Sequence, residues 1–502
     1  MKRAFLLCSA IACAFLLASC AERAREEGPA EVPRGIPEEL REIMRANVEA
    51  TLPAFHPDFE EAWESLSPDG YDLETDEAIA AILADTERRS PTAIIRMAAI
   101  EEELHFLFDL LRYAYAGYNY FGGDGVFLPL RDAMLERARE LTARSGFMSI
   151  DSYRSQILAL YLRGVIADNH FHVERARMAA PNYVQLSNSG FILRRSEEGL
   201  VTEREGEAYR FLGAEFHDGS SDPGILPALT AEGEFVFMLG RHAPESDLGA
   251  RDIAVRLQSL KTGAERVVET RLFPIVGSRP REPGNLPPEA REEGGAWIVE
   301  IGNFANPSPE TLQAFRESGE EARGRPVVVL DLRGNVGGSL SLAFEWIRGF
   351  SGWEPALPAI AVPMALGTLA AGSMEQVGIG SLAGREWNLD LEGRKAIPNE
   401  SLVIALVDGW TASAGELFIG ALRQMENVLV VGTSTMGTML GFNPVAASLP
   451  NSGVVMIFGR GISLRPDLSR IEGVGFLPDL WVPPGEALQR ALAFVERYSL
   501  AR

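Results

Sequence analysis

Residues 401–423, SLVIALVDGWTASAGELFIGALR, decide the fold because they join a strand to a helix through a short turn. The apolar run Leu402–Val407 is short, rich in β-branched residues and followed by an Asp-Gly pair, a pattern that predicts a buried strand ending in a sharp turn. From Ala414 the apolar residues recur on one face of a helix. The pattern therefore places Ser413 at a helix N-terminus, just beyond the end of a buried strand.

Ser413 has two interpretations at this position. As an N-cap it would pair with Glu416 in the S-x-x-E pattern of a capping box. As a nucleophile it would have the first-turn N–H groups and the positive end of the helix dipole beside it, and both stabilise an oxyanion. The small neighbours Ala412, Ala414 and Gly415 leave the hydroxyl uncovered, which favours the nucleophile.

Composition and charge limit the classes of function. The chain has 502 residues, of which 46% are hydrophobic, so we expect two to four globular domains with a substantial core. The formal net charge of −23 argues against nucleic acid as a partner, because no extended basic surface would neutralise phosphates.

The first 19 residues have the pattern of a processing signal. Two basic residues precede the apolar run 4–18, and the sequence Leu-Ala-Ser-Cys ending at Cys20 resembles the bacterial lipobox. The resemblance implies lipidation of Cys20 and a lipid anchor on the periplasmic or extracellular face of the cell envelope. An ordinary secretory signal is the alternative. The later apolar region 356–371 is interrupted by prolines and is short for a bilayer.

Four further segments follow from composition and periodicity. Residues 20–37 are charged and proline-rich, which predicts a flexible tether. Helical periodicity dominates 38–175, short β-type runs dominate 176–285, and strands alternate with helices in 286–502. We therefore expect an α/β C-terminal domain behind a helical segment and a β-rich middle module, which itself either binds extended peptide or serves only as a lid or spacer.

His170 and His172 follow Asp168 where the helical pattern changes to an extended one. Either histidine could be a general base near neutral pH, or simply a buried, hydrogen-bonded residue. Without a cysteine or an H-E-x-x-H partner, the pair predicts no metal site.

The glycine-rich sequence DLRGNVGGS, residues 331–339, ends an apolar strand. Its glycines free the backbone to turn and expose N–H groups, as in an anion-binding nest, although a tight turn into the next helix also explains them. The spacing differs from G-x-G-x-x-G, so we expect no dinucleotide cofactor, and no other cofactor is indicated.

Taken together, these motifs resemble the C-terminal processing (tail-specific) serine proteases, particularly their tricorn-like branch. The matching segments, in the family's order, are VVVLDLRGNVGG at 327–338, VIALVDGWTASAGE at 403–416, VGTSTMG at 431–437 and IEGVGFLPD at 471–479, with YAYAGYNYFGGD at 113–124 and IADNHFHV at 166–173 in the helical segment. The resemblance implies an α/β plus α+β architecture: a crotonase-like or ClpP-like α/β catalytic core at 286–502 and an N-terminal helical cap at 38–175 ending in the D-x-H motif, with the active site between them.

The resemblance also implies roles for individual residues. The nucleophile would be Ser413. One oxyanion donor would be the backbone N–H of Ala414, and another that of Gly337 or Gly338. The helix start is independently expected to present free N–H groups at Ala414. The glycine-rich nest is expected to present them at Gly337 and Gly338.

The base departs from the processing-protease branch. That branch has a lysine shortly after the G-x-x-T-x-G segment, whereas this chain has Thr438 there. Outside the signal the only lysines are Lys261 and Lys395, both in polar turns or loops. In the tricorn-like branch a histidine replaces lysine, which implies His170 as the base and Glu472 as its supporting carboxylate.

We therefore expect a serine endopeptidase that hydrolyses polypeptides through a Ser-His-Glu acyl-enzyme mechanism, because serine needs a base and the base needs an orienting acceptor. His172 remains the alternative base, being two residues away on the same expected strand face. The main alternative function is a catalytically silent peptide-binding lipoprotein on the same fold, which Thr438 in the lysine position would support. An enzyme acting on acyl thioesters is a third class.

Overall fold

The computed structural model describes most of the chain. The described residues are 35–51, 56–58, 61–62, 93–174, 176–177, 183–217, 223–244, 250–274, 287–355, 360–363, 396–465, 467–469 and 472–501. Cys20 and the rest of the expected signal and tether up to residue 34 lie outside them. Among the helices formed by these residues, none combines the length and the apolarity needed to span a bilayer.

The C-terminal core is a parallel sheet covered by helices. Its strands are β13 (Ala296–Glu300), β14 (Val327–Asp331), β16 (Leu402–Val407) and β17 (Val428–Gly432), with β12 (Glu289–Glu293) antiparallel at the edge and β20 (Leu480–Trp481) beside β17. Its helices are α9 (Pro309–Ala322), α10 (Leu340–Ser351), α12 (Ala414–Leu422) and α13 (Ala487–Arg497), the last preceded by η4 (Pro484–Glu486). The alternating strands and helices expected from the sequence are confirmed, as is the strand–turn–helix around Ser413.

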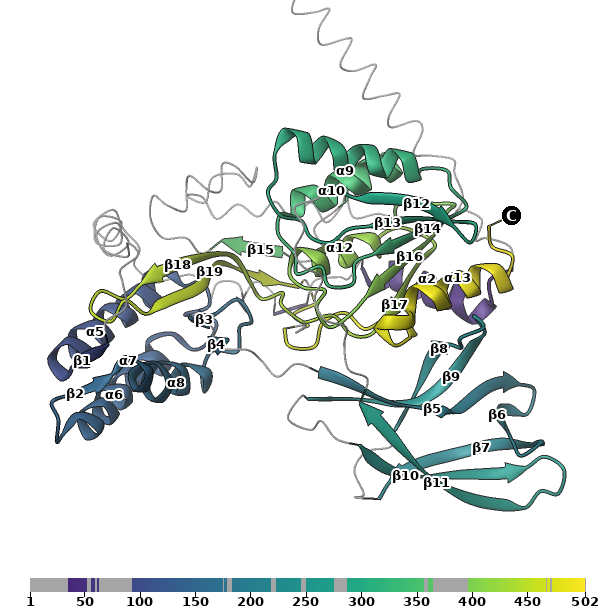
Figure 1. Ribbon diagram of the computed structural model, residues 1–502, viewed down its shortest axis with the longest axis horizontal. Coiled ribbons are helices and arrows are strands. Elements are labelled where there is room, and N and C mark those ends of the chain that lie inside the picture. The colour runs from purple at the N-terminus through teal and green to yellow at the C-terminus, as the bar shows by residue number, and fades with distance from the viewer. Residues whose placement is uncertain are drawn as a thin grey trace, which may run out of the picture.

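Strand alternation explains the two buried faces of this sheet. Val328 and Val403 face α9, α10 and α12, whereas Val327 and Leu402 face α13 on the other side. Because both faces are buried, β16 is apolar throughout and β14 is apolar up to Asp331 at its end. The result is a three-layer α/β/α core, with α9 and α10 above the sheet and α13 below it in Figure 1.

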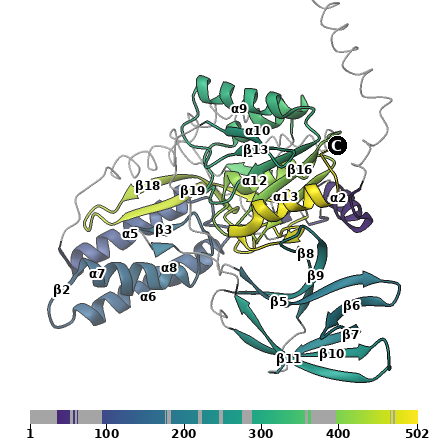
Figure 2. The same cartoon turned by 45° about the vertical axis from the view of Figure 1, so that its right-hand side comes forward.

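One helix lies elsewhere than its place in the sequence indicates. The sequence pattern assigns helix α2 (Glu38–Ala50) to the helical segment 38–175. In the structure its apolar residues Leu40 and Met44 pack with α13 against the C-terminal sheet. Figure 2 shows α2 on the core, well away from α5 to α8.

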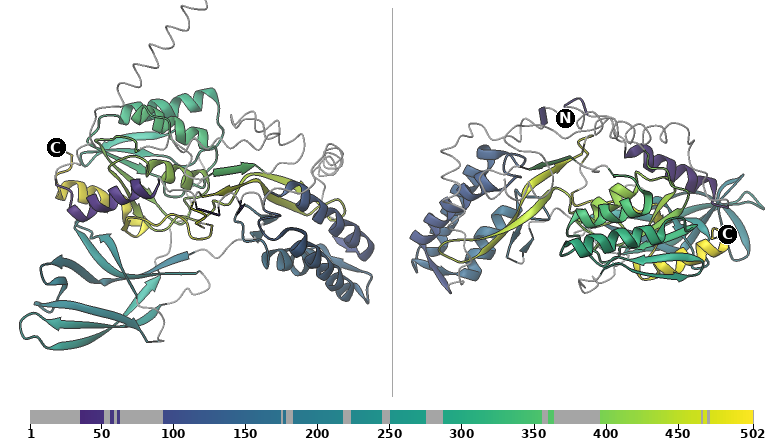
Figure 3. Two further views of the ribbon diagram at one scale, coloured as in Figure 1. Left: turned by 180° about the vertical axis from the view of Figure 1, so that it is seen from behind. Right: turned by 90° about the horizontal axis from the view of Figure 1, so that it is seen from above.

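The other helices form a separate layer that a long hairpin joins to the core (Figure 3). These elements are β1 (Ile94–Arg96), α5 (Met97–Ala114), α6 (Gly123–Thr142), β2 (Phe147–Ser149), α7 (Ile150–Tyr153), η1 (Arg154–Leu158) and α8 (Ala159–Arg163), with β18 (Gly441–Ser448) and β19 (Val455–Leu464) as the hairpin and β15 (Ile360–Pro363) beside β19. Met456 and Phe458 of the hairpin are buried among the helices. The short β3 (His172–Val173) pairs with β19 and with β4 (Ala176–Arg177), so the helical segment returns to the core at this point.

The middle module is a small closed sheet that continues into the core sheet. Its strands are β5 (Tyr183–Ser196), β6 (Gly199–Arg204), β7 (Glu207–Phe216), β8 (Gly224–Leu229), β9 (Phe235–Pro244), β10 (Arg251–Ser259) and β11 (Glu265–Pro274). Strand β11 pairs back onto β5, which closes a ring through β6, β7 and β10. Strand β8 pairs with β20 through Ala228 and Trp481, so the module joins the core through its β-sheet.

Candidate active site

Ser413 sits in a strained turn between β16 and α12. Its backbone has φ 53° and ψ −119°, a left-handed conformation that glycine usually occupies. Such a conformation costs a non-glycine residue on the order of 1–2 kcal/mol, and retained strain of this kind concentrates at functional sites. The side chain is only half-buried, although both neighbours, Ala412 and Ala414, are buried.

His170 reaches this serine from 243 positions earlier in the chain. Its Nε2 lies 3.2 Å from Ser413 Oγ, within the range for proton transfer. His170 is part of a turn before β3, and its backbone N–H donates to Asp168 Oδ1 at 2.8 Å. Asp168 Oδ2 in turn accepts from the Tyr115 hydroxyl at 3.0 Å. The turn that holds the imidazole is therefore fixed by the buried side chain of Asp168.

His172, the alternative base, has its ring elsewhere. Its Nε2 lies 3.0 Å from the carbonyl oxygen of Asn169. Strand β3 begins only at His172, so His170 lies in a turn outside it and strand alternation does not place the two rings on one face. The structure brings His170, and not His172, to Ser413.

Glu472 lies beneath the turn that carries His170. Its Oε1 accepts from the Asn169 N–H at 2.7 Å, and its Oε2 accepts from the N–H groups of Met439 and Leu440, each at 2.7 Å. These recorded hydrogen bonds of Glu472 all come from backbone groups. Burial, and then the nearby charge of Asp168, raise the pKa of Glu472 from its ordinary value of 4.5 to about 8. Burial likewise raises the pKa of Asp168 to about 6.

The glycine-rich turn after β14 packs directly on the nucleophile. Gly337 has φ 96°, and a Cβ added to it would lie 2.9 Å from both Ser413 Cβ and the Ala414 nitrogen. Its N–H already donates to Asn335 Oδ1 at 2.9 Å. Within the described chain, the N–H groups of Gly338 and Ala414 have no recorded acceptor. Of the two candidate glycines, Gly338 therefore keeps a donor available for an oxyanion.

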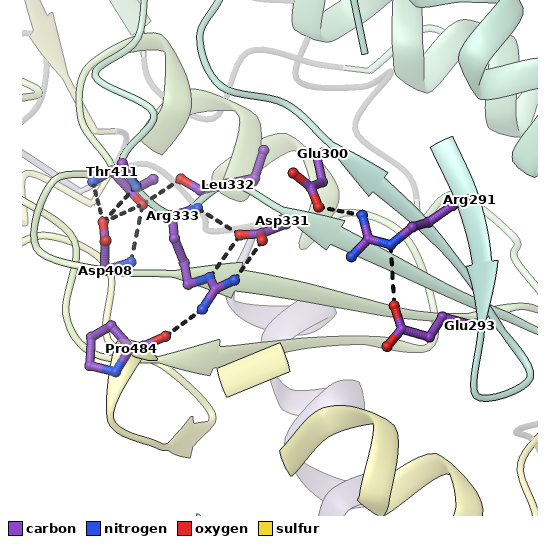
Figure 4. Close-up of polar contacts among 10 residues, drawn as sticks. Arg291, Glu293, Glu300, Asp331, Leu332, Arg333, Asp408, Thr411 and Pro484 are labelled. Atoms are coloured by element: carbon purple, nitrogen blue, oxygen red, sulfur yellow. Dashed lines mark hydrogen bonds and ion pairs between the residues drawn. The ribbon is translucent and has the colours of Figure 1, made fainter. Parts of the chain in front are cut away.

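Asp408 and Thr411 hold the two strand-end turns together (Figure 4). Asp408 Oδ1 accepts from the N–H of Gly334 at 3.0 Å and from the N–H groups of Trp410 and Thr411 in its own turn. The Thr411 hydroxyl donates to the Leu332 carbonyl at 3.0 Å. The glycine turn and the serine turn are thus fixed side by side.

Asp331 and Arg333 fix the base of the glycine turn. Asp331 is fully buried and forms a bidentate ion pair with Arg333 at 2.8 and 2.7 Å. Figure 4 shows the guanidinium lying between Asp331 and the carbonyl oxygen of Pro484, to which it also donates. This pair therefore fixes the start of the glycine turn against the segment that carries Pro484.

Glu416, which the sequence predicted only as a capping partner, holds more than the helix start. Its Oε2 accepts from the Ser413 N–H at 3.0 Å, which is the capping contact expected of S-x-x-E. Its side chain also accepts from three donors of the 435–438 loop. Sequence alone does not show this, because those donors lie about twenty positions later and two of them are backbone groups.

Thr438, in the position of the lysine, supplies no base. Its N–H donates to Glu416 Oε2 at 2.7 Å, and its hydroxyl is buried with no hydrogen-bond partner in the described part of the chain. Lys261 is exposed in the turn between β10 and β11, and Lys395 lies outside the described residues. The described residues also form no cluster of three or more histidine, cysteine, aspartate or glutamate side chains that could hold a metal ion.

Comparison with known families identifies the class of protein that carries this site. Residues 297–482 match the model described as Peptidase family S41. Through this segment the chain resembles the tail-specific serine proteases of family S41, and the match supports a serine-type peptidase. A search of curated proteins gave no significant match.

Several solved structures resemble the chain at low identity. Mature CPAF is 15% identical with a TM-score of 0.40, covering 80% of this chain and 96% of its own. The photosystem II D1 C-terminal processing protease is 16% identical with a TM-score of 0.36, covering 79% and 97%. The tricorn protease is 12% identical with a TM-score of 0.35, covering 80% of this chain and 37% of its own.

Proposed function

We propose that this serine peptidase is an endopeptidase that cleaves polypeptides through an acyl-enzyme formed on Ser413. His170 Nε2 takes the proton of the Ser413 hydroxyl as its oxygen attacks the scissile carbonyl carbon. The oxyanion that forms accepts hydrogen bonds from the N–H groups of Ala414 and Gly338. The imidazolium then gives its proton to the leaving amine, and water, activated by the same imidazole, hydrolyses the ester.

One observation carries the proposal: the 3.2 Å contact between His170 Nε2 and the hydroxyl of a serine held in a left-handed backbone conformation. A capping serine needs neither the strain nor the imidazole. Glu472 is the supporting carboxyl group, because its bond to the Asn169 N–H holds the residue that precedes His170. These contacts support the tricorn-like arrangement, with histidine in place of lysine.

The finer fold assignment is part of the same proposal. We assign the C-terminal α/β unit to the crotonase-like or ClpP-like cores and the layer of α5 to α8 to a cap. The turn that carries His170 supports this assignment, because it connects the helical layer with β3 and contacts the serine of the core. The active site would then lie where cap and core meet.

We place the enzyme in the bacterial cell envelope, held by a lipid at Cys20. The apolar run before Cys20 and the lipobox-like residues support this location. Radioactive fatty acid should label the full chain in cells, and Cys20→Ser should abolish the label. If the Cys20→Ser variant were still labelled, Cys20 would not be the site of a lipid anchor.

A fluorophosphonate probe tests the chemistry directly. It should label the wild-type chain at Ser413, and Ser413→Ala should remove the label. His170→Ala should lower turnover on an unstructured protein such as casein by about 10³-fold or more, because the serine loses its base. His172→Ala is the matched control and should retain most of the activity. Full activity after His170→Ala would overturn the mechanism, and peptide binding without cleavage or labelling would favour the catalytically silent alternative.

A further inference from the structure

Glu416 is a fully buried carboxylate for which the reaction above gives no role. It is 0% exposed, and burial raises its pKa while its hydrogen bonds act in the opposite direction. Among the described residues, no arginine, lysine or histidine forms an ion pair with it. Four donors surround it instead, which matches the acceptor capacity of an ionised carboxylate.

The four donors come from two separate parts of the site. One is the N–H of Ser413, 3.0 Å from Oε2. The other three belong to the loop after β17: the Thr435 hydroxyl at 2.6 Å, the Gly437 N–H at 2.8 Å and the Thr438 N–H at 2.7 Å. A single side chain therefore connects the backbone of the nucleophile to this loop.

The same loop contacts the residue that precedes the base. The carbonyl oxygen of Gly437 accepts from Asn169 Nδ2 at 2.8 Å, and Asn169 is 2% exposed. Gly437 packs closely on the 472–474 segment: its φ is 76°, and an added Cβ would lie 2.7 Å from the backbone nitrogens of Gly473 and Val474. A continuous path of hydrogen bonds thus runs from Ser413 through Glu416 and Gly437 to Asn169, next to His170.

We propose that Glu416 and Asn169 are positioning residues that hold the 435–438 loop from its two sides and thereby fix the separation of Ser413 and His170. The inference rests on the proposed function and adds to it the device that aligns nucleophile and base. Neither side chain touches the reacting atoms. Alignment of this kind is costly to lose, because a displacement of about 1 Å can slow a reaction by about 10²-fold.

Glu416→Gln is the sharpest test because it keeps the size of the side chain. In either orientation of the new amide, its NH₂ group faces at least one backbone N–H that the carboxylate accepted. If the NH₂ group takes the place of Oε1, it faces the Thr435 hydroxyl and the Gly437 N–H loses its acceptor. If it takes the place of Oε2, the N–H groups of Ser413 and Thr438 lose theirs. Either orientation therefore weakens the connection between the nucleophile and the loop.

The experiment is a double-mutant cycle on the full chain with Glu416→Gln and Asn169→Ala. The readout is the second-order rate constant for fluorophosphonate labelling of Ser413, together with the thermal unfolding midpoint. Each single variant should label at least about tenfold more slowly, and the double variant should be no more than about threefold slower than the slower single one, because both interrupt the same path. Glu320→Gln, on the exposed side of α9, is the matched control and should label at the wild-type rate.

The inference would be overturned if the double variant's loss in labelling rate equalled the product of the two single losses. It would also be overturned if either single variant labelled at the wild-type rate. If Glu416→Gln does not fold, Thr435→Val replaces it in the cycle with the same expected coupling. A wild-type chain that is not labelled at all would contradict the proposed function instead, so the two failures are distinguishable.

Discussion

Gly337 shows how far the site depends on a single missing side chain. Its φ of 96° disfavours any L-residue, and a Cβ would lie 2.7 Å from the Ala412 carbonyl oxygen and 2.9 Å from Ser413 Cβ. We expect Gly337→Ala to lower kcat/KM by about 10²-fold or more, because the serine turn or the oxyanion donors must move. The cost in stability should stay on the order of 1–2 kcal/mol. Peptidase assays and denaturant unfolding measure the two effects separately.

Gly302 provides the control for this substitution. An added Cβ there meets nothing within 4 Å, and its φ is not in the left-handed region. Gly302→Ala should therefore keep wild-type activity. Equal activity of the two variants would show that the close approach of Gly337 to the serine turn has no catalytic consequence.

Single residues also show where inference from sequence stops. Ser413 and Gly337 lie in local patterns, a strand–turn–helix and a glycine-rich strand end, so their neighbourhood is visible in the sequence. His170 needed the resemblance to a family, because its partner is 243 positions away. The contacts of Glu416 with the 435–438 loop depend on tertiary packing, and no local pattern encodes them. The bond from the Gly337 N–H to Asn335 Oδ1 spans only two residues and is a local contact of the Asx type.

At the scale of elements, the turns after β14 and β16 act as one unit because Asp408 joins them. Its Oδ1 accepts from the N–H groups of Gly334, Trp410 and Thr411, and Asp408 is 0% exposed. Asp408→Ala would leave three donors without this acceptor, so we expect a loss of roughly 3 kcal/mol or more in the free energy of unfolding. Asp408→Asn keeps an oxygen in place and should cost far less. Urea unfolding of both variants makes the comparison.

The exposed Asp132→Ala is the control for a lost carboxylate and should change stability little. If Asp408→Ala and Asp408→Asn were equally stable, the charge and not the acceptor would be what matters. If neither differed from wild type, the two turns would not depend on this residue.

The elements themselves were largely predictable, but their partners were not. Periodicity identified β16, α12 and the β-type runs within β9, β10 and β11 of the middle module, since period and turn residues are local properties. Helix α2 was also recognised, but its apolar face packs on the C-terminal sheet rather than on the helices that follow it. An amphipathic pattern states which face is buried and not what covers it.

At the scale of the whole molecule, buried carboxyl groups join the helical layer to the core and should make stability depend on pH. Asp168 holds Tyr115, just after α5, and the turn of His170, while Glu472 holds that turn and the loop before β18. Burial raises the pKa of Asp168 to about 6 and that of Glu472 to about 8. The folded protein therefore binds these protons more tightly than the unfolded chain does.

The sign follows from linkage: this contribution is fully present below the unfolded pKa values near 4 and is lost as pH rises through the folded values. One pKa unit corresponds to about 1.4 kcal/mol, so the two raised pKa values together correspond to a loss on the order of 5–10 kcal/mol in the free energy of unfolding between about pH 4 and pH 8. The net charge of −23 acts in the same direction, because self-repulsion grows as carboxyl groups ionise. Thermal unfolding at constant ionic strength should show a lower midpoint at pH 8.5 than at pH 6. Glu472→Gln should reduce this difference while Glu320→Gln leaves it unchanged, and a midpoint that rises with pH in both the wild type and Glu472→Gln would contradict the assignment.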